Sequence, residues 1–502
     1  MINTPETYSS NEITEYIKSK NVKKISKEFL KTEKVYSFIF FGIAFIIMNN
    51  VVFKEMGIIS TLIYFVLNTM AIIYLKKKKC QFSSFNKIIA GIIYVFSLTF
   101  SITENGFIKF LDNNFLLVLL AYFIYSVSCG HKKVESFMLI AILKSFIELP
   151  LNHFDKEMYA LKSALKGTKA GSNLITVILA LIISVPLTLF VFMRLVDADS
   201  MFNAIMGNIS ELFSEGDIRS IVLKLVFSIP IACYIFGLFY SNANPENKDI
   251  ITSESFKAML DKSRKIKNIA LYSAVTPICV LYIIYVFSQI AYFISPFAAI
   301  LPEGYSYAEY ARSGFSGLMG IAVLNLAVII VMNYCAKNSG QNKPKALAVY
   351  SFMLCAFTLF IIATAIAKMV MYISEYGLTQ LRVYTMWFMI LLTFLFLMII
   401  IRQFKRDFNI VKYFSIVFVA MFAVLCFSRP DACIVKCNIE LYENGYIDEV
   451  DESQFFGTSD DAYLTAYKNG YINDEKLEDY VSYKSFYDKL NYSTFMLWVY
   501  SE

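Results

Sequence analysis

The sequence predicts an all-α, polytopic membrane protein with about eleven transmembrane helices, and three observations support this fold class. Hydrophobic residues make up 57% of the 502 residues and charged residues only 17%, whereas soluble globular domains usually carry about 25% charge. The mean hydropathy is +0.55. Apolar runs of roughly 20 residues, the length that crosses a bilayer as a helix, recur along the chain. So few charges could not cover a water-facing surface.

Residues 1–34 predict a cytoplasmic basic tail, because seven lysines lie among few apolar residues. The tail fits either a solvated positive segment or an amphipathic helix on the anionic inner leaflet. The first apolar run begins near Val35 and lacks a small-residue cleavage site. It therefore predicts a signal anchor and not a cleaved signal peptide.

Residues 35–427 predict the transmembrane helical domain. Its predicted spans lie near 35–53, 57–75, 85–103, 113–130, 173–193, 219–240, 269–293, 314–333, 345–373, 382–402 and 410–427. One further apolar segment, 134–150, contains Lys144 and Glu148. A crossing there would invert every later loop, so we expect an interfacial or re-entrant helix on the inner face.

Basic residues concentrate in every second connection between these spans. The tail 1–34 holds seven Lys and Arg, 76–87 holds five and 130–171 holds seven, whereas the intervening connections hold one or two. By the positive-inside rule the N-terminus is cytoplasmic, and eleven crossings place the C-terminus outside. This distribution also explains the net charge of +6 without a nucleic-acid partner.

Residues 428–502 predict an acidic extracytoplasmic helical tail, with six Lys and Arg against fifteen Asp and Glu. The tail contains a near-repeat, Tyr442–Asp448 and Tyr467–Asn473. In each copy we expect the glycine, Gly445 or Gly470, to end a helix in the left-handed conformation, and the final Asp or Asn to cap the next helix. The tail forms either a packed cap over the membrane helices or a protein-binding module.

Polar residues gather on the predicted outer face and form a candidate site. Arg312 and Arg382 each lie near the outer N-terminus of a membrane helix, against the helix dipole, so each is expected to have an anionic partner. Thr379 is expected to cap the helix that carries Arg382. The arginines either make ion pairs that hold helix ends and tail together or bind an anionic ligand, which guanidinium groups suit. The candidate residues are Asp197, Asp199, Glu309, Arg312, Thr379, Arg382, Asp431 and Asn438.

Two lysines, Lys224 and Lys368, fall within predicted spans. A lysine inside a membrane is a candidate functional residue. Both lie within about two turns of a helix end, so their ammonium groups could also reach the interface.

The sequence predicts no catalytic residue, metal site or cofactor. The only histidines, His131 and His153, lie in a predicted inner loop, and no hydrolase, metalloprotease or nucleotide-binding motif occurs in a convincing context. Cys433 and Cys437 have neither zinc nor redox spacing. Paired carboxylates such as Asp460 and Asp461 could bind a cation, but such pairs are usually solvated. Membrane-embedded acids are nearly absent, which argues against an ion-coupled transporter.

Four stretches resemble bacterial membrane proteins of the family called domain of unknown function 4173, which is related to family 4153. They are 197–202, 289–315, 376–384 and 431–462, the last containing Asp431-Ala-Cys-Ile-Val-Lys-Cys-Asn438. The resemblance covers roughly residues 170–470. It implies a fold and a location and no activity.

The residues together predict a non-enzymatic multi-pass protein of the bacterial cytoplasmic membrane. Its expected partners are the lipid bilayer and, at the candidate site of the outer face and at the acidic tail, an envelope protein or an anionic ligand. A small-molecule or lipid transporter or flippase is the alternative, based on proline-kinked helices and the two lysines. A membrane-embedded transferase, with Asp197, Asp199 or Glu309 as base, is a second alternative.

Overall fold

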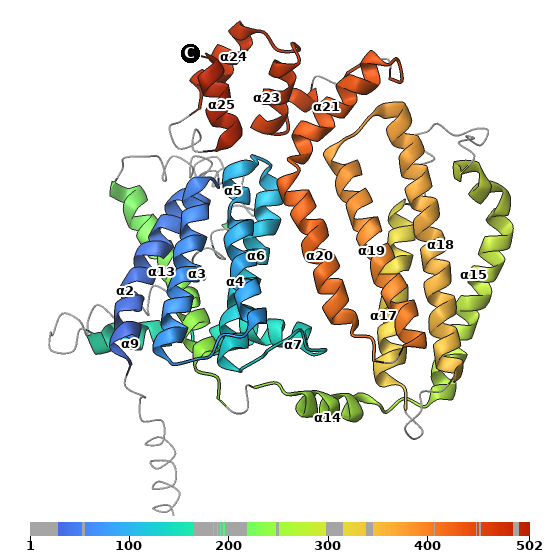
Figure 1. The fold of residues 1–502 in the computed structure, drawn as a ribbon, viewed down its shortest axis with the longest axis horizontal. Helices are drawn as coiled ribbons and strands as arrows, with labels where there is room; N and C mark the ends of the chain where they lie inside the picture. Colours follow the sequence, from blue (N-terminus) through green and yellow to red (C-terminus); the bar gives the residue numbers. More distant parts are fainter. Residues whose placement is uncertain are drawn as a thin grey trace, which may run out of the picture. The chain divides into compact units, whose positions relative to one another are not determined.

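The fold, seen in a computed structural model, is helical in every regular element of its described part (Figure 1). Apart from a few single positions between 184 and 195, the structure describes residues 29–52, 56–164, 218–246, 250–297, 315–337, 345–405, 407–447, 449–450, 453–484 and 491–501. Within these residues the β structure is one isolated bridge between Ile266 and Ala336.

Ten helices in the described residues are long and apolar enough to cross a membrane. They overlap ten of the eleven predicted spans, and the remaining one, near 173–193, lies outside the described residues except for a few positions. The ten are Lys31–Val51, Ile58–Lys77, Ser84–Ile102, Gly106–Ser128, Lys224–Ala243, Asn268–Phe287, Gly317–Cys335, Lys345–Tyr376, Gln380–Phe404 and Ile410–Phe427. The multi-pass architecture is therefore confirmed, and the orientation of the termini stays a prediction.

The ambiguous segment 134–150 forms a broken helix. It comprises α7 (Met138–Leu143), the π-turn η2 (Lys144–Glu148) and α8 (Leu149–Asn152). None of these pieces is long enough to span a hydrocarbon core, which needs about 20 helical residues. The interruption begins at Lys144, where a charged side chain enters the apolar run.

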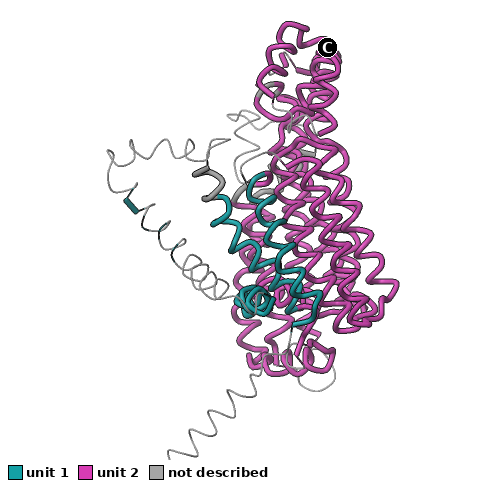
Figure 2. The backbone as a smooth tube through the Cα atoms, turned by 90° about the vertical axis from the view of Figure 1, so that its left-hand side faces the viewer, with its two compact units in different colours: residues 1–49, 149–241 teal, residues 50–148, 242–502 magenta. Residues whose placement is uncertain are grey.

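The chain divides into two compact units (Figure 2). Unit 1 comprises residues 1–49 and 149–241, and unit 2 comprises 50–148 and 242–502. The C-terminal residues thus belong to the same unit as most of the membrane helices.

Unit 1 contains α2 (Lys31–Ile47), α9 (Lys156–Ala164) and most of α13 (Ile218–Ala243). Aromatic side chains pack α2 against α13, with the rings of Phe40 and Phe239 4.6 Å apart. A side chain at Gly237 would lie 2.7 Å from the carbonyl oxygen of Pro150, so only glycine allows this approach.

One helical group of unit 2 comprises α3 (Ile58–Lys77), α4 (Ser84–Ser97), α5 (Thr99–Ile102), α6 (Gly106–Ser128) and α20 (Ile410–Phe427). Polar caps define where these helices begin, since Ser83 accepts from the amide of Asn86 and Asn105 from that of Ile108. The rings of Phe96 and Phe422 stack at 5.6 Å and join α4 to α20.

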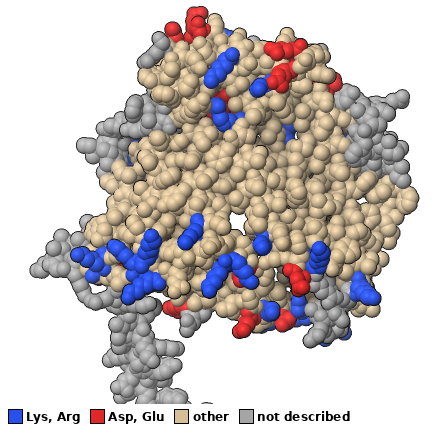
Figure 3. Space-filling view, viewed as in Figure 1, with Lys and Arg blue, Asp and Glu red and all other residues tan. Residues whose placement is uncertain are grey.

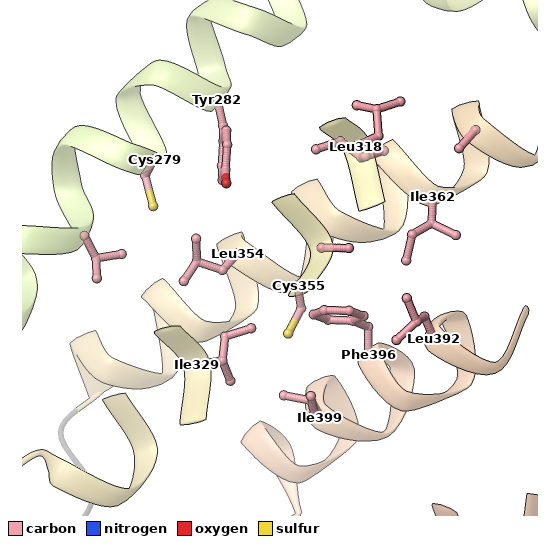
Figure 4. Packing of buried hydrophobic residues seen from close by; sticks show 14 of the residues in the cluster. Cys279, Tyr282, Leu318, Ile329, Leu354, Cys355, Ile362, Leu392, Phe396 and Ile399 are labelled. Carbon is pink, nitrogen blue, oxygen red and sulfur yellow. The ribbon is translucent and has the colours of Figure 1, made fainter. Parts of the chain in front are cut away.

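A second group comprises α15 (Asn268–Phe297), α17 (Phe315–Cys335), α18 (Lys345–Tyr376) and α19 (Gln380–Phe404). Its core is mostly apolar, and Figure 4 shows Cys355 of α18 facing Phe396 of α19. Both side chains are fully buried. The short helix α14 (Ser253–Ser263) precedes this group and has no buried residue.

The outward faces of these helices are apolar as well. On α15, Ile269, Ile284 and Phe287 are 73%, 62% and 71% exposed. Over α18 to α20, the visible middle of the surface carries no charged atoms (Figure 3). Such a surface suits a hydrocarbon environment and not water.

The described part of the C-terminal region forms five helices with a core of their own. They are α21 (Pro430–Glu443), α22 (Ser453–Phe456), α23 (Asp460–Lys468), α24 (Asp474–Ser482) and α25 (Tyr492–Ser501). Val435 of α21, Tyr463 of α23, Leu477 of α24 and Leu497 of α25 meet in this core.

The near-repeat has the predicted geometry where the structure describes it. Gly445 and Gly470 follow α21 and α23 with φ of 72° and 78°. Asn473 caps α24 by accepting from the amide of Lys476 at 3.1 Å. Its counterpart in the first copy, Asp448, lies outside the described residues.

Candidate functional site

The predicted outer-face residues fall into two sets. Thr379, Arg382, Asp431 and Asn438 lie where α18, α19 and α21 meet. The other four, Asp197, Asp199, Glu309 and Arg312, lie outside the described residues. The described set adjoins a larger group of polar residues in unit 2, which we call the polar junction: Thr103, Glu104, Asn105, Gln380, Arg429, Asp431, Ser459, Asp460, Asp461, Asn491 and Ser493.

Asn438 fixes the turn between α18 and α19. Its side-chain amide accepts from the amide of Leu378 at 2.6 Å and donates to the carbonyl of Leu378 at 2.9 Å. The preceding residue, Gly377, has φ of 70°, and a Cβ there would lie 2.7 Å from Asn438 Oδ1. The turn therefore requires glycine both for its backbone conformation and for its contact.

Thr379 is the N-cap of α19, as the sequence predicts, and accepts from the amide of Arg382 at 3.4 Å. Arg382 turns back over the end of α18. Its guanidinium donates to the carbonyl oxygens of Tyr376, at 2.9 Å, and Gly377. It also lies 3.9 Å from the centre of the Tyr372 ring.

The anionic partner expected for Arg382 is not among the described residues, and the expectation stays a prediction. Within the described residues the partners are the carbonyl groups at the C-terminus of α18 and an aromatic face. These carbonyls carry partial negative charge and attract a cation. Arg382 opposes the dipole of its own helix but complements that of the preceding one.

Asp431 lies in the first turn of α21 and is 1% exposed. Its carboxylate accepts from Asn105 Nδ2 at 2.8 Å, Gln380 Nε2 at 2.8 Å and Ser459 Oγ at 2.6 Å. Burial raises the pKa of Asp431, although these three hydrogen bonds oppose the rise. One carboxylate thus joins α6, α19 and the start of α23.

Asp461 joins the tail to the loop between α5 and α6. It is fully buried and accepts from Thr103 Oγ1 at 2.5 Å and from the backbone amide of Glu104 at 3.0 Å. Arg429, with φ of 51°, pairs with it at 3.0 Å, and Ser493 also donates to it. The Asp461 carboxylate of α23 is therefore connected through Arg429 to the end of α20 and through Ser493 to α25.

Asp460, the neighbour of Asp461 on α23, has a different set of partners and is 2% exposed. It pairs with Lys484 at 2.9 Å and accepts from Tyr480 at 2.7 Å and Thr494 at 2.5 Å. The expectation that Asp460 and Asp461 are solvated is therefore wrong. Both are buried because each has a cationic partner and further donors within the tail.

Asn491 attaches the last helix to the membrane helices. Its amide nitrogen donates to the carbonyls of Phe100 at 3.1 Å and Thr103 at 3.0 Å, which end α5. Sequence reasoning missed Asn491, Arg429 and Thr103 because their importance comes from partners more than 30 residues away. The one signal in the sequence that could have pointed to such a residue was its position, as a polar side chain at the end of a predicted span.

A small cavity opens beside the junction. It has a volume of about 200 Å³ and is lined by Thr379, Gln380, Leu381, Asp431, Ile434, Val435 and Thr458. The cavity combines an aliphatic wall with the first turn of α19. It is smaller than the pockets of roughly 300–1,000 Å³ that hold drug-sized ligands.

The two intramembrane lysines have different environments. Lys224, in unit 1, is 5% exposed and donates to Asn49 Oδ1 at 2.9 Å. It is the first residue of its candidate span. Lys368 lies within α18 and is half-buried. Lys224 therefore has a polar partner near a helix end.

The described residues contain no group of three or more His, Cys, Asp and Glu side chains placed to hold a metal ion. His131 packs between the rings of Tyr125 and Phe137. Its pKa is lowered, mainly by burial.

Comparison with protein families matches residues 90–469 to the family described as domain of unknown function 4153. This is the group related to the one that the motifs resemble. No curated protein and no solved structure shows a significant match to the chain.

Proposed function

We propose that this chain, which belongs to the family described as domain of unknown function 4153, is a protein of the bacterial cytoplasmic membrane whose outward-facing C-terminal helices bind a protein partner in the envelope. The ten long apolar helices support a multi-pass membrane location. The polar junction supports the binding role, because it holds the C-terminal helices on the membrane helices through buried charges. A partner bound there would be anchored to the membrane.

The surface of the C-terminal helices supports a protein as the partner. Tyr446 and Tyr483 are 70% and 83% exposed. Tyrosine is enriched in protein interfaces, since it supplies a large contact area with few rotatable bonds. The carboxylates of the junction, in contrast, already have partners, which leaves them little capacity for catalysis.

The distribution of basic residues supports the outward orientation. In unit 2, basic side chains gather at the helix ends opposite the C-terminal helices (Figure 3). They include Lys76, Lys77, Lys132, Lys133, Arg402 and Lys405. By the positive-inside rule this end faces the cytoplasm.

Site-specific photo-crosslinking in intact cells tests the role. A photoreactive residue in place of Tyr446 or Tyr483 should give a discrete protein adduct. The same residue in place of Met259, which is 48% exposed on α14, is the control and should not give it. Equal adducts from all three positions, or none, would contradict a partner at the C-terminal helices.

A reporter fused after Glu502 tests the orientation separately. It should be active only in the envelope, and cytoplasmic activity would refute the outward-facing tail.

An anionic ligand is the second candidate, and the cavity beside the junction favours it. The first-turn amides of α19 could donate to a small anionic group there. Asp431 on the same wall opposes an anion while it is ionised. Isothermal titration of the purified protein with inorganic phosphate, compared with the Thr379→Ala variant, tests this candidate. Equal heats for the two proteins would exclude the cavity as the site.

A further inference from the structure

Helix α14 lies across one end of unit 2, next to the ends of α15 and α17 (Figure 1). One contact near each of its ends attaches it to the neighbouring elements. The ring of Phe256 lies 6.1 Å from that of Phe137, and Ser263 donates to the carbonyl oxygen of Tyr334 at 3.2 Å. No residue of α14 is buried. The helix is therefore held at both ends and keeps its side chains open between them.

The sequence of α14 is amphipathic. Phe256, Met259 and Leu260 are three and four residues apart, so they share one face of the helix. Phe256 and Leu260 are half-buried, and Met259 is 48% exposed. With about 3.6 residues per turn, Lys257 and Lys262 lie on the two flanks of this apolar face. Both lysines are exposed.

The acidic residues of α14 lie on the opposite face. Glu254 and Asp261 are about half a turn away from the apolar face, and Asp261 pairs with Arg264 at 2.8 Å. In a helix that lies in a membrane interface, lysines bury their stems beside the apolar face and place their ammonium groups among the lipid head groups. Acidic side chains in that place would repel anionic head groups. With its lysines on the flanks and its acids opposite, α14 has the pattern of an interfacial helix.

The basic segment continues from α14 to the start of α15. Lys265 and Lys267 are exposed. Lys337, which follows α17, is exposed as well, and its backbone amide donates to the carbonyl oxygen of Ile266 at 2.8 Å. The apolar outward face of α15 begins directly afterwards with Ile269, which is 73% exposed. These lysines therefore lie at the boundary between the apolar surface that suits lipid and the charged end of the protein.

The lysines of this segment have no ion-pair partner among the described residues. Residues 253–267 contain five basic and two acidic side chains, and Arg264 is the basic residue that pairs with an acid. The other four basic residues are exposed lysines: Lys257, Lys262, Lys265 and Lys267. Exposed ammonium groups are stable in water, so charge alone would not define a site. Here the charge adjoins both an apolar helix face and the lipid-facing surface of α15.

We propose that residues 256–267, which we call the α14 surface, bind the phosphate head groups of anionic phospholipids in the adjoining leaflet. Phosphate is complementary to the four lysines, and the apolar face of α14 suits the region just below the head groups. Clusters of about four to eight basic residues beside a membrane helix are typical of such binding, and each basic residue near an anionic lipid surface strengthens it about fivefold. This binding does not depend on the C-terminal helices or on the orientation of the chain.

Photo-crosslinking from position 259 tests the α14 surface in the purified full-length chain. A diazirine-bearing residue replaces Met259, and the protein is placed in nanodiscs with equal amounts of phosphatidylglycerol and phosphatidylcholine. Mass spectrometry of the irradiated protein gives the ratio of the two lipid adducts at this position. The anionic lipid should exceed the neutral one by at least about fivefold, and the ratio should fall toward one at about 1 M salt, where charges are screened beyond about 3 Å. Lipid is thus the adduct expected here, in contrast to the protein adduct expected at Tyr446 and Tyr483.

Two double variants show whether the preference comes from α14. Lys257→Gln with Lys262→Gln should lower the ratio about fivefold or more. Lys76→Gln with Lys87→Gln removes the same charge from the last turn of α3 and the first turn of α4, and it should keep the wild-type ratio. All four lysines are exposed, so both variants should unfold at the wild-type temperature. A wild-type ratio of one, a ratio independent of salt, or an equal loss in the two double variants would overturn the proposal.

Discussion

In the polar junction, Asp431, Asp460 and Asp461 each accept three or more hydrogen bonds, whereas Asp112 in α6 accepts none from the described residues. All four side chains are at most 2% exposed. Burial is thus the same, and the difference lies in what compensates it. Hydrogen-bond donors from distant parts of the chain make the polar junction a structural connection between the membrane helices and the C-terminal helices. The Asp112 carboxyl has no comparable set of donors among the described residues.

The largest expected effect comes from removing a charge in the junction. Asp461→Asn leaves Arg429 without its counter-charge, and loss of one member of a buried pair costs about 3–5 kcal/mol. We expect the lower value, because the Arg429 side chain is 23% exposed. Hydrogen exchange of the amides of α25 should then be roughly a hundredfold faster. Unchanged exchange would mean that the pair does not hold the tail.

Alanine substitutions at two glycines separate the cost of the left-handed backbone from the cost of a steric clash. Gly377→Ala should destabilise the protein by about 2 kcal/mol, since it combines a left-handed backbone with a clash against Asn438. Gly445→Ala is the matched control. It has nearly the same φ but no atom within 4 Å of the added Cβ, so about 1 kcal/mol is expected. Denaturant unfolding of both variants measures the difference, and equal losses would remove the role of the Asn438 contact.

The pH dependence of the junction should be altered by Asp431→Asn. The folded pKa of Asp431 is raised, so the folded state holds the proton more tightly than the unfolded state does. This group therefore lowers stability as the pH rises from the unfolded value of about 4 to the folded pKa. The difference in unfolding free energy between wild type and variant should shrink or reverse over that range and be constant above it. A difference independent of pH would show that Asp431 is not perturbed.

The smallest effect is expected on the surface of the tail. Lys436 and Glu440 pair at 3.8 Å with side chains 68% and 58% exposed. Lys436→Ala should change the unfolding free energy by no more than about 0.5 kcal/mol. A larger loss would indicate that exposure does not separate structural from incidental charges in this domain.

Periodicity and composition predicted the helical class and ten of the span positions, because apolar runs of membrane length are a local property. Thr379, Gly445 and Gly470 were predicted for the same reason, since helix caps depend on adjacent residues.

The partners of the polar residues could not be predicted in this way. Arg382 binds the carbonyls of the preceding helix, and Asp461 binds Thr103, which is 358 residues distant. The burial of Asp112 in α6 was missed for a local reason. The span was placed by hydropathy alone, whereas the capping side chain of Asn105 starts the helix earlier.

Asp461 and Asn491 contact residues far earlier in the sequence, and this separation affects how the protein is assembled during synthesis. The carbonyls of Phe100 and Thr103 gain their side-chain donor only when residue 491 has been made. Ribosomes add about 5–20 residues per second, so the 358 residues between Thr103 and Asp461 take about 20 to 70 seconds. During that interval the ends of α5 and α6 that meet the C-terminal helices lack their final partners. Insertion of the early helices and completion of the polar junction are therefore separate events in time. A chain truncated before the tail would leave the polar groups between α5 and α6 without the partners that the tail supplies.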